Sequence, residues 1–329
     1  MKTKKLGKII VSITLLAASF MFTGCSSKKA DEQVVIYTNA DDEAVVAMQN
    51  ALDNNGYKDK YILQSFGTSE LGGKLLAEGD NIEADLVTMS SFYLDSAQAN
   101  KNMFLDLDFE TGALEEYPSY YTSITAQEGA LIYNTEVVKE NNLPLPESIA
   151  DLANPVYKGF ISVTDIQSSS TAWLLIQALI SEYGEDGAKE YLTAIYDNAG
   201  VHIESSGSGP IKKVRSGEVA IGFGLRHQAV ADKEEGLPID YIDPTEGNFS
   251  LTESVAVVDK KDKTNKLAMK MAECIIKNGR QDLLNTYPIA LYEGEETNST
   301  SKSNNFKVFG EALTVDLLEK HQELSESCK

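Results

Sequence analysis

The chain has 329 residues, with 29 Lys and Arg against 50 Asp and Glu, and a formal net charge of −21. Nucleic-acid backbones and anionic lipid surfaces attract clusters of basic side chains, so this acidic balance argues against both as partners. Three Cys and three His in the whole sequence exclude a disulfide scaffold and argue against a zinc site of ordinary spacing. The length suggests about two domains, and 42% hydrophobic residues suffice for buried cores.

The N-terminus has the pattern of an export signal. Four lysines within the first eight residues precede an apolar run over residues 9–22, which is short for a bilayer span. The run leads to Thr23-Gly24-Cys25, and a small-residue stretch ending in cysteine resembles the lipobox of bacterial lipoproteins. We therefore expect a signal peptide over residues 1–24, lipidation at Cys25 and a polar tether over 25–33. The alternative is an ordinary secretory signal with a chance cysteine.

The first part of the chain alternates between strand and helix patterns. Short apolar runs of strand type lie at residues 34–37, 61–64 and 85–89. Helix patterns open at Asp41, after the first run, and at Thr68, after the second. Strands that alternate with helices form βαβ units, so a mostly parallel sheet is expected.

The same alternation returns further along the chain, around a break at the Leu-Pro-Leu-Pro of residues 143–146. Strand patterns lie at 130–134, 160–163, 201–204, 219–224 and 254–258, and helix patterns at 171–180, 190–196, 211–215, 266–276, 282–284 and 306–318. Residues 293–304 are polar and predict a surface loop. Two α/β blocks fit the length, and the late helices can return to the first block.

Several short motifs, in their order and spacing, resemble family-1 extracellular solute-binding proteins of ATP-binding-cassette (ABC) importers, in the branch that binds ferric iron or 2-aminoethylphosphonate. The motifs lie at residues 34–40, 67–75, 84–87, 131–135, 146–152, 157–159 and 216–222. The resemblance implies an α/β, two-lobe periplasmic-binding-protein type II fold, with a ligand cleft between lobes joined by hinge strands. Lobe 1 would comprise residues 34–127 and 256–329, and lobe 2 residues 128–255. The C-terminal tail of lobe 1 could also contact lobe 2.

One motif departs from the iron-binding members of this family. Those members place two adjacent tyrosines just after the strand that corresponds to residues 217–222, and phenolate oxygen holds a hard ferric ion. Here the segment reads Phe-Gly-Leu-Arg-His-Gln over residues 223–228, without tyrosine. The adjacent pair Tyr120 and Tyr121 lies elsewhere and is interpreted as loop aromatics. No metal site is therefore expected.

Four loops place small hydroxyl residues or glycine just before a helix, and they supply the candidate ligand-binding residues Thr68, Ser69, Ser90, Ser91, Ser169, Ser170, Thr171 and Ser208. Backbone N–H groups and hydroxyls at such positions can surround a tetrahedral oxyanion. The alternative is plain helix capping, since Ser and Thr are preferred N-caps.

The remaining candidates are charged or polar residues near strand ends. Arg226 can pair bidentately with phosphonate, phosphate or carboxylate, or lie on the surface. His227 can add a donor, or be structural. Asn39, Asp41 and Asp42 follow the first strand and could either bind an ammonium group or cap the next helix. Glu253 is a further candidate for an ammonium group.

The expected function is that of a monomeric, lipid-anchored binding protein on the extracytoplasmic face of a bacterial membrane, without a cofactor. It would capture a small anion, 2-aminoethylphosphonate first, and deliver it to the permease of an ABC importer. Ferric iron or an iron chelate is the alternative ligand. A secreted phosphohydrolase is the alternative from another class, although no Gly-x-Ser-x-Gly, His-Glu-x-x-His or Walker A pattern occurs. A third hypothesis is a sensor subunit that uses the same fold to signal the ligand to a membrane partner.

Overall fold

The computed structural model describes residues 33–297 and 303–329. The expected signal peptide, Cys25 and all of the tether but residue 33 lie outside the described residues, as does part of the loop expected at 293–304. Within the described ranges, no helix combines the length and the apolar character that crossing a membrane requires.

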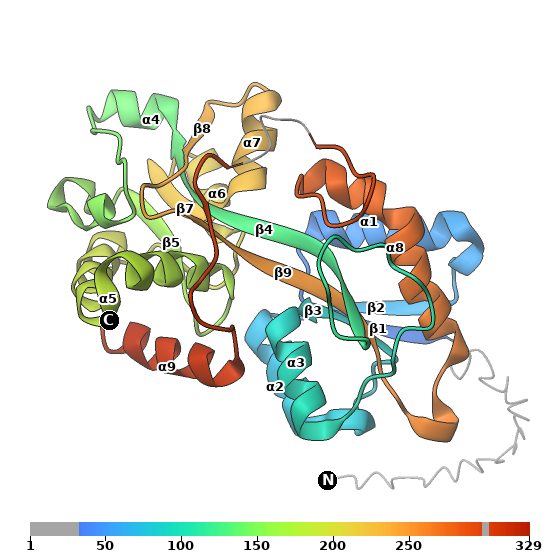
Figure 1. Cartoon of the computed structure of the whole chain (residues 1–329). Coiled ribbons are helices and arrows are strands. Elements are labelled where there is room, and N and C mark those ends of the chain that lie inside the picture. The colour runs from blue at the N-terminus through green and yellow to red at the C-terminus, as the bar shows by residue number, and fades with distance from the viewer. Residues whose placement is uncertain (1–32, 298–302) are drawn as a thin grey trace, which may run out of the picture. The chain divides into compact units, whose positions relative to one another are not determined.

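A first βα block begins the described chain (Figure 1). Parallel pairs join β1 to β2 and to β3, so that the three strands end at the same edge of the sheet. A helix follows each strand. The elements are β1 (Val34–Thr38), α1 (Asp42–Leu52), β2 (Tyr61–Ser65), α2 (Thr68–Glu78), β3 (Leu86–Ser90) and α3 (Ser91–Lys101).

A second βα block lies further along the chain, with β5 parallel to both β6 and β7. Its long helix α5 bends at Gly184, whose φ of 69° lies outside the helical region. The elements are α4 (Thr135–Glu140), β5 (Ile161–Thr164), α5 (Thr171–Ala199), β6 (Ile203–Glu204), α6 (Gly209–Arg215), β7 (Ile221–Leu225), α7 (Arg226–Glu234) and β8 (Ile239–Ile242). Short 3-10 turns lie at Gly79–Asn81, Ala150–Ala153, Pro155–Tyr157 and Lys261–Lys263.

Two long strands, β4 (Tyr121–Asn134) and β9 (Asn248–Val257), pair antiparallel and run through both blocks (Figure 1). The strand order is β2-β1-β3-β9-β4-β7-β5-β6, with β8 on β4 and the short β10 (Phe306–Lys307) on β9. The parallel pairing expected from the βαβ units is found within both blocks, although it does not extend to the whole sheet. The sheet is mixed, because β9 is antiparallel to β3, and β4 is antiparallel to β7, β8 and β9.

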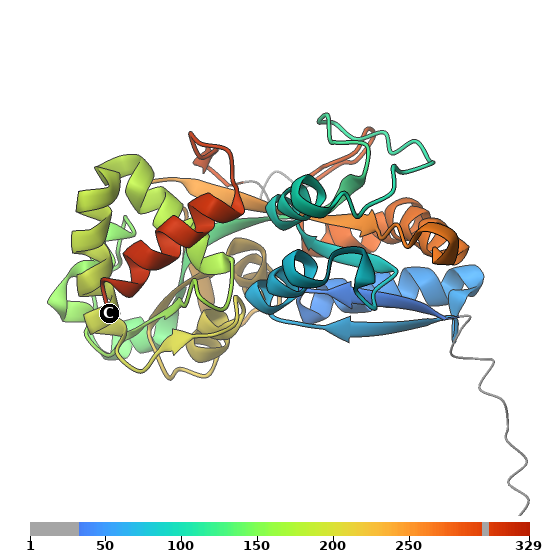
Figure 2. The same cartoon turned by 90° about the horizontal axis from the view of Figure 1, so that it is seen from below.

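The C-terminal part of the chain returns to both blocks. Helix α8 (Lys266–Thr286) packs on α1 and joins two helix patterns that the sequence kept apart. Helix α9 (Val315–Glu326) packs on α5 and also touches α3 (Figure 2). The helix expected at 306–318 was wrong: its first residues pair with β9, and α9 begins only after Thr314, whose hydroxyl caps it by accepting from Leu317 N.

The two cysteines in the described residues are free and buried. Cys274 lies in the apolar cluster between α1, β1 and α8, and its Sγ lies 3.5 Å from Ala51 O. Cys328 follows α9, in a different cluster that contains Trp173, and its Sγ donates to Leu324 O at 3.2 Å. They therefore do not pair with each other.

Candidate functional site

A cavity of about 370 Å³ lies beyond the carboxyl ends of β1, β2 and β7, where ligand sites of α/β sheets commonly form. Both βα blocks line it. The first block contributes residues 39–42 and 66–68, the second contributes 168–171, 205–208, Lys212 and Leu225, and the long strands contribute Gln127 and Glu253.

The second block supplies a wall of hydroxyl groups, formed by residues 168–171 and 205–208 and called here the hydroxyl wall. Ser169, Ser170 and Thr171 are 8%, 9% and 6% exposed, and Thr171 is the first residue of α5. A side chain at Gly207 would overlap that of Thr171. Glycine at this position therefore allows the second loop to approach the start of α5.

Thr68 and the N-cap serines of the hydroxyl wall are not used as helix caps, although the Ser169 hydroxyl accepts from Thr171 N at 3.4 Å. In the described structure, the N-cap residues Gly67 of α2, Ser170 of α5 and Ser208 of α6 make no side-chain capping bond. Side chains cap α4, α8 and α9, which begin away from the cavity, and also α1, which begins at it. The first turn of α2 therefore presents N–H groups to the cavity and residues 168–171 present hydroxyls to it, which favours an anionic ligand group.

Glu253 of β9 brings a buried carboxyl group to the same cavity, with 6% of the residue exposed. Its Oε1 accepts from the Ser90 hydroxyl at 2.8 Å and from Asn39 Nδ2 at 3.4 Å, while Oε2 has no hydrogen-bond partner among the described residues. Burial raises the pKa of Glu253 to about 7, although the two hydrogen bonds act in the opposite direction. The unbonded oxygen allows this carboxyl group to accept a further hydrogen bond when it is ionised.

Asp41 extends the acidic part of the lining. It caps α1 by accepting from Ala44 N at 3.3 Å, and it also accepts from the Tyr287 hydroxyl. Burial raises the pKa of Asp41. Asn39 Nδ2 also donates to Thr68 Oγ1 at 3.1 Å and so links the acidic side to the start of α2. The acidic wall is defined here as Asn39, Asp41, Asp42 and Glu253.

Three of the predicted hydroxyl residues lie outside the lining of this cavity. The Ser69 hydroxyl is hydrogen-bonded to Tyr93. The Ser90 hydroxyl supports Glu253, as described above. Ser91 is hydrogen-bonded to Thr252 and Ser254 of β9, at 3.0 and 2.7 Å between hydroxyl oxygens. Ser90 and Ser91 thus hold the junction between β3 and β9 that carries Glu253.

Arg226 and His227 begin α7 and also lie outside this lining. The buried guanidinium of Arg226 pairs with Asp243, with 2.7 Å between Nε and Oδ1, and lies 4.7 Å from the centre of the Tyr241 ring. The His227 ring lies 4.4 Å from the Tyr287 ring between centroids. Burial lowers the pKa of His227 to about 4, so the imidazole is neutral at pH 7.

Among the candidates, the structure brings together Asn39, Thr68, Ser169, Ser170, Thr171, Ser208 and Glu253. Sequence reasoning missed Gln127, Ser205, Ser206 and Lys212. The serines directly precede Gly207, so extending that loop by two residues would have found them. Gln127 lies in a polar half of β4 that gave no strand pattern. Lys212 is the only basic residue in the described lining.

Solved structures of the same fold are periplasmic binding proteins. AfuA from Actinobacillus pleuropneumoniae, with fructose-6-phosphate bound, is 20% identical, with a TM-score of 0.70 over 90% of this chain and 97% of that one. Iron-bound HitA from Pseudomonas aeruginosa is also 20% identical, with a TM-score of 0.70 over 90% and 99%. A periplasmic thiamin binding protein is 16% identical, with a TM-score of 0.73 over 90% and 95%. The chain therefore has the two-lobe fold of periplasmic binding proteins.

The sequence comparisons are more specific. Residues 83–313 match the bacterial extracellular solute-binding protein family, and the chain belongs to it. An Fe(3+)-binding periplasmic protein of Serratia marcescens is 30% identical over 219 residues, which are 64% of this chain and 62% of that protein. An uncharacterised protein of Haemophilus influenzae is 27% identical over 267 residues, or 75% and 73% of the two chains. The predicted family and two-lobe fold are confirmed.

Proposed function

We propose that this protein is the binding component of an ABC importer and that its ligand is a small phosphonate or phosphate that carries an amine, with 2-aminoethylphosphonate first. It would bind and release the ligand without making or breaking a bond. We further propose that export and lipidation at Cys25 hold it at the extracytoplasmic face of the membrane.

One observation carries the choice of ligand: the hydroxyl wall and the acidic wall line the same cavity. The hydroxyls of the hydroxyl wall and the first N–H groups of α2 would donate to phosphonate oxygens, aided by the positive end of the helix dipole. The free Oε2 of Glu253 and the carboxylate of Asp41 would accept from an ammonium group. Because Arg226 pairs with Asp243, the anion would be bound by the hydroxyl wall and Lys212 instead.

The ligand class is tested by calorimetric titration of the chain without residues 1–25. The panel contains 2-aminoethylphosphonate, ethylphosphonate, which lacks the amine, and ethanolamine, which lacks the phosphonate, together with phosphate, fructose 6-phosphate and thiamin. The expected order is 2-aminoethylphosphonate, then ethylphosphonate, with ethanolamine the weakest. Tight binding of ethanolamine or thiamin without binding of either phosphonate would contradict the proposal.

The hydroxyl wall is tested by Thr171→Val, which removes one hydroxyl and keeps the shape of the side chain. A hydrogen bond to a charged group contributes about 1.5–3 kcal/mol, so affinity is expected to fall roughly tenfold to a hundredfold. The control is Thr193→Val on the exposed side of the same helix, where the hydroxyl donates to Lys189 O at 2.9 Å. Equal effects of the two substitutions on affinity would remove Thr171 from the site.

Ferric iron, free or chelated, is the second candidate, because the relative from Serratia marcescens is named an Fe(3+)-binding periplasmic protein. The described cavity lining contains no tyrosine to supply a phenolate. Tyr120 and Tyr121 donate instead to Asp95, at 2.7 and 3.4 Å. Titration with ferric citrate decides between the candidates: visible tyrosinate absorbance or tight binding would favour iron over the phosphonate.

A further inference from the structure

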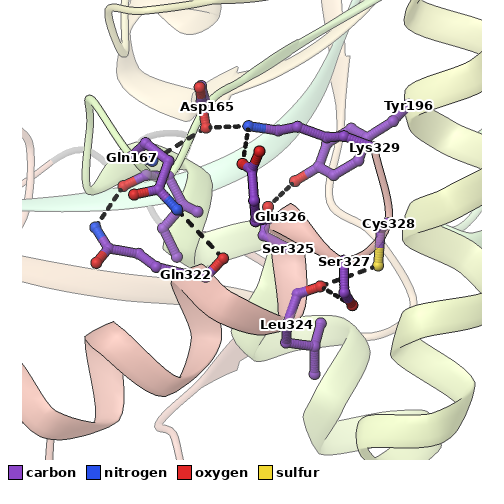
Figure 3. A network of polar contacts seen from close by, with 11 residues as sticks. Asp165, Gln167, Tyr196, Gln322, Leu324, Ser325, Glu326, Ser327, Cys328 and Lys329 are labelled. Atoms are coloured by element: carbon purple, nitrogen blue, oxygen red, sulfur yellow. Dashed lines mark hydrogen bonds and ion pairs between the residues drawn. The ribbon is translucent and has the colours of Figure 1, made fainter.

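The C-terminal helix α9 is fastened to the segment that carries the first half of the hydroxyl wall. The Trp173 indole N–H donates to His321 Nδ1 at 2.7 Å, and the two residues are 0% and 1% exposed. Gln322 and Gln167 extend the contact (Figure 3). Gln322 Nε2 donates to Ile166 O at 3.1 Å, and Gln167 Nε2 donates to Gln322 O at 3.3 Å.

The last residue of the chain adds an ion pair at the start of the same segment. Lys329 Nζ lies 2.9 Å from Asp165 Oδ1 (Figure 3). Asp165 shapes the turn that follows it, because its carbonyl oxygen accepts from Ser168 N at 3.1 Å and from Ser169 N at 3.0 Å. Its carboxylate also accepts from Gln167 N at 3.0 Å. Helix α9 thus contacts the chain on both sides of residues 168–171.

Trp173 connects this contact to a third helix. Its ring meets the Phe92 ring of α3 edge-on, with 5.1 Å between centroids, and its other neighbour His321 lies 6.0 Å from Phe309. The first turn of α5 is therefore packed between α3 and the C-terminal segment. A side chain that is fully buried and hydrogen-bonded at this point leaves the turn few alternative conformations.

We infer that α9 is a positioning element for ligand binding: His321 and Gln322 hold the hydroxyls of residues 168–171 in place without touching the ligand themselves. Affinity depends on such preorganisation, since a mobile turn must be ordered when the ligand binds. This inference rests on the proposed function for its effect on affinity, but its effect on the turn itself does not depend on any ligand.

The test compares contacts that α9 makes at the turn with one that it makes elsewhere on α5. His321→Phe removes the acceptor of the indole N–H, and Gln322→Met removes the donor to Ile166 O. Ser325→Ala is the matched control, because the Ser325 hydroxyl is hydrogen-bonded at 2.7 Å to Tyr196, further along α5, and is fully buried. The readouts are amide hydrogen exchange of Ser168 and Ser169 by NMR, thermal unfolding, and titration with 2-aminoethylphosphonate.

All three variants are expected to lower the unfolding temperature, but only the first two should alter the turn. In these two variants, the amide exchange rates of Ser168 and Ser169 should rise about tenfold. The affinity for 2-aminoethylphosphonate should fall roughly fivefold to tenfold, as expected for the loss of one supporting hydrogen bond. The control should leave both values unchanged.

The inference is overturned if the control changes exchange and affinity as much as the other variants, or if His321→Phe and Gln322→Met change neither. If the unaltered chain binds no phosphonate, the proposed function fails, while the exchange comparison still decides the role of α9. If His321→Phe does not fold, Gln322→Met, at a partly exposed position, carries the comparison with the control.

Discussion

At the scale of single residues, Glu253 is the side chain whose chemistry depends most on its surroundings. The pKa of its carboxyl group is raised from an ordinary 4.5 to about 7 because the group is buried. This carboxyl group is therefore partly protonated near neutral pH. An ammonium group bound beside it would favour the carboxylate, so binding of an aminophosphonate should release protons in mildly acidic solution.

The raised pKa of Glu253 predicts how stability changes with pH. The folded state holds this proton more tightly than the unfolded state, so the free energy of unfolding falls as the pH rises from about 4.5 to about 7. Glu253→Gln removes this loss and is expected to stabilise the protein on the order of 3 kcal/mol more at pH 8 than at pH 4. Urea unfolding across this pH range measures the difference.

His227 supplies an internal comparison with the opposite sign. Burial lowers its pKa to about 4, so its contribution to stability is lost as the pH falls from about 6.5 towards 4. In the wild type, the contributions of His227 and Glu253 to the pH dependence partly cancel. In Glu253→Gln the contribution of His227 is no longer opposed, so the free energy of unfolding should rise with pH. A variant whose stability runs parallel to that of the wild type at every pH would contradict the shift assigned to Glu253.

Much of the candidate site could be predicted from residue type and position. Thr68, Ser170 and Ser208 were found because hydroxyl residues at helix starts have a recognisable local pattern. Arg226 could not be assigned in the same way, because its partner Asp243 lies seventeen positions along the chain on a different element. A pairing of that kind depends on tertiary structure, which no local pattern contains.

At the scale of elements, two adjacent glycines in α2 give a matched pair of tests. A side chain at Gly72 would overlap the Tyr93 ring of α3, whereas one at Gly73 would meet nothing within 4 Å. Gly72→Ala is expected to destabilise the protein by about 1–3 kcal/mol through overpacking. Gly73→Ala should stabilise it by up to about 1 kcal/mol, because alanine is the better helix former.

Thermal unfolding of both variants measures the contrast between the two glycines. Equal effects would mean that α2 and α3 do not pack closely at Gly72. A loss of affinity in Gly72→Ala would further link this packing to the start of α2, since Tyr93 also receives the hydrogen bond of Ser69.

The elements that the sequence predicted well are those with apolar runs. The first halves of β4 and β9 were missed because they are rich in polar residues, such as Thr122 and Ser123. These are nonetheless buried, hydrogen-bonded to Tyr292 at 2.8 Å and to Ser254 at 3.1 Å, respectively. A strand whose polar side chains are satisfied by partners distant in sequence does not show hydrophobic alternation, so its pattern is hidden.

At the scale of the whole molecule, the net charge of −21 predicts an unusual dependence on salt. A ligand with net negative charge must approach against a repulsive field, which salt screens. Raising the salt concentration from about 10 mM to about 150 mM shortens the screening length from about 30 Å to about 8 Å. The affinity for phosphate or 2-aminoethylphosphonate is therefore expected to rise about twofold to threefold.

Titrations at the two salt concentrations check this expectation. Lys212, the basic residue of the described lining, acts in the opposite direction because salt also screens its attraction. A fall in affinity with salt would therefore show that the local charge of Lys212 outweighs the charge of the whole molecule. Lys212→Gln should then abolish that fall.

The two long strands also suggest how the molecule closes. We propose that β4 and β9 are the hinge, with lobe 1 formed by residues 34–127 and 256–329 and lobe 2 by residues 128–255. Both strands cross between the blocks that line the cavity. Helix α9 belongs to lobe 1 in this division but packs on α5 of lobe 2, so it would move with the hydroxyl wall.

Trp173 is the single tryptophan of the chain, and it lies two residues from Thr171. Its fluorescence therefore comes from one known place, the joint between the hydroxyl wall and α9. An indole that is fully buried and hydrogen-bonded to an imidazole emits according to that contact, so its spectrum and lifetime follow any movement of the joint. The protein thus contains its own optical label, which reports the integrity of this joint without an attached dye.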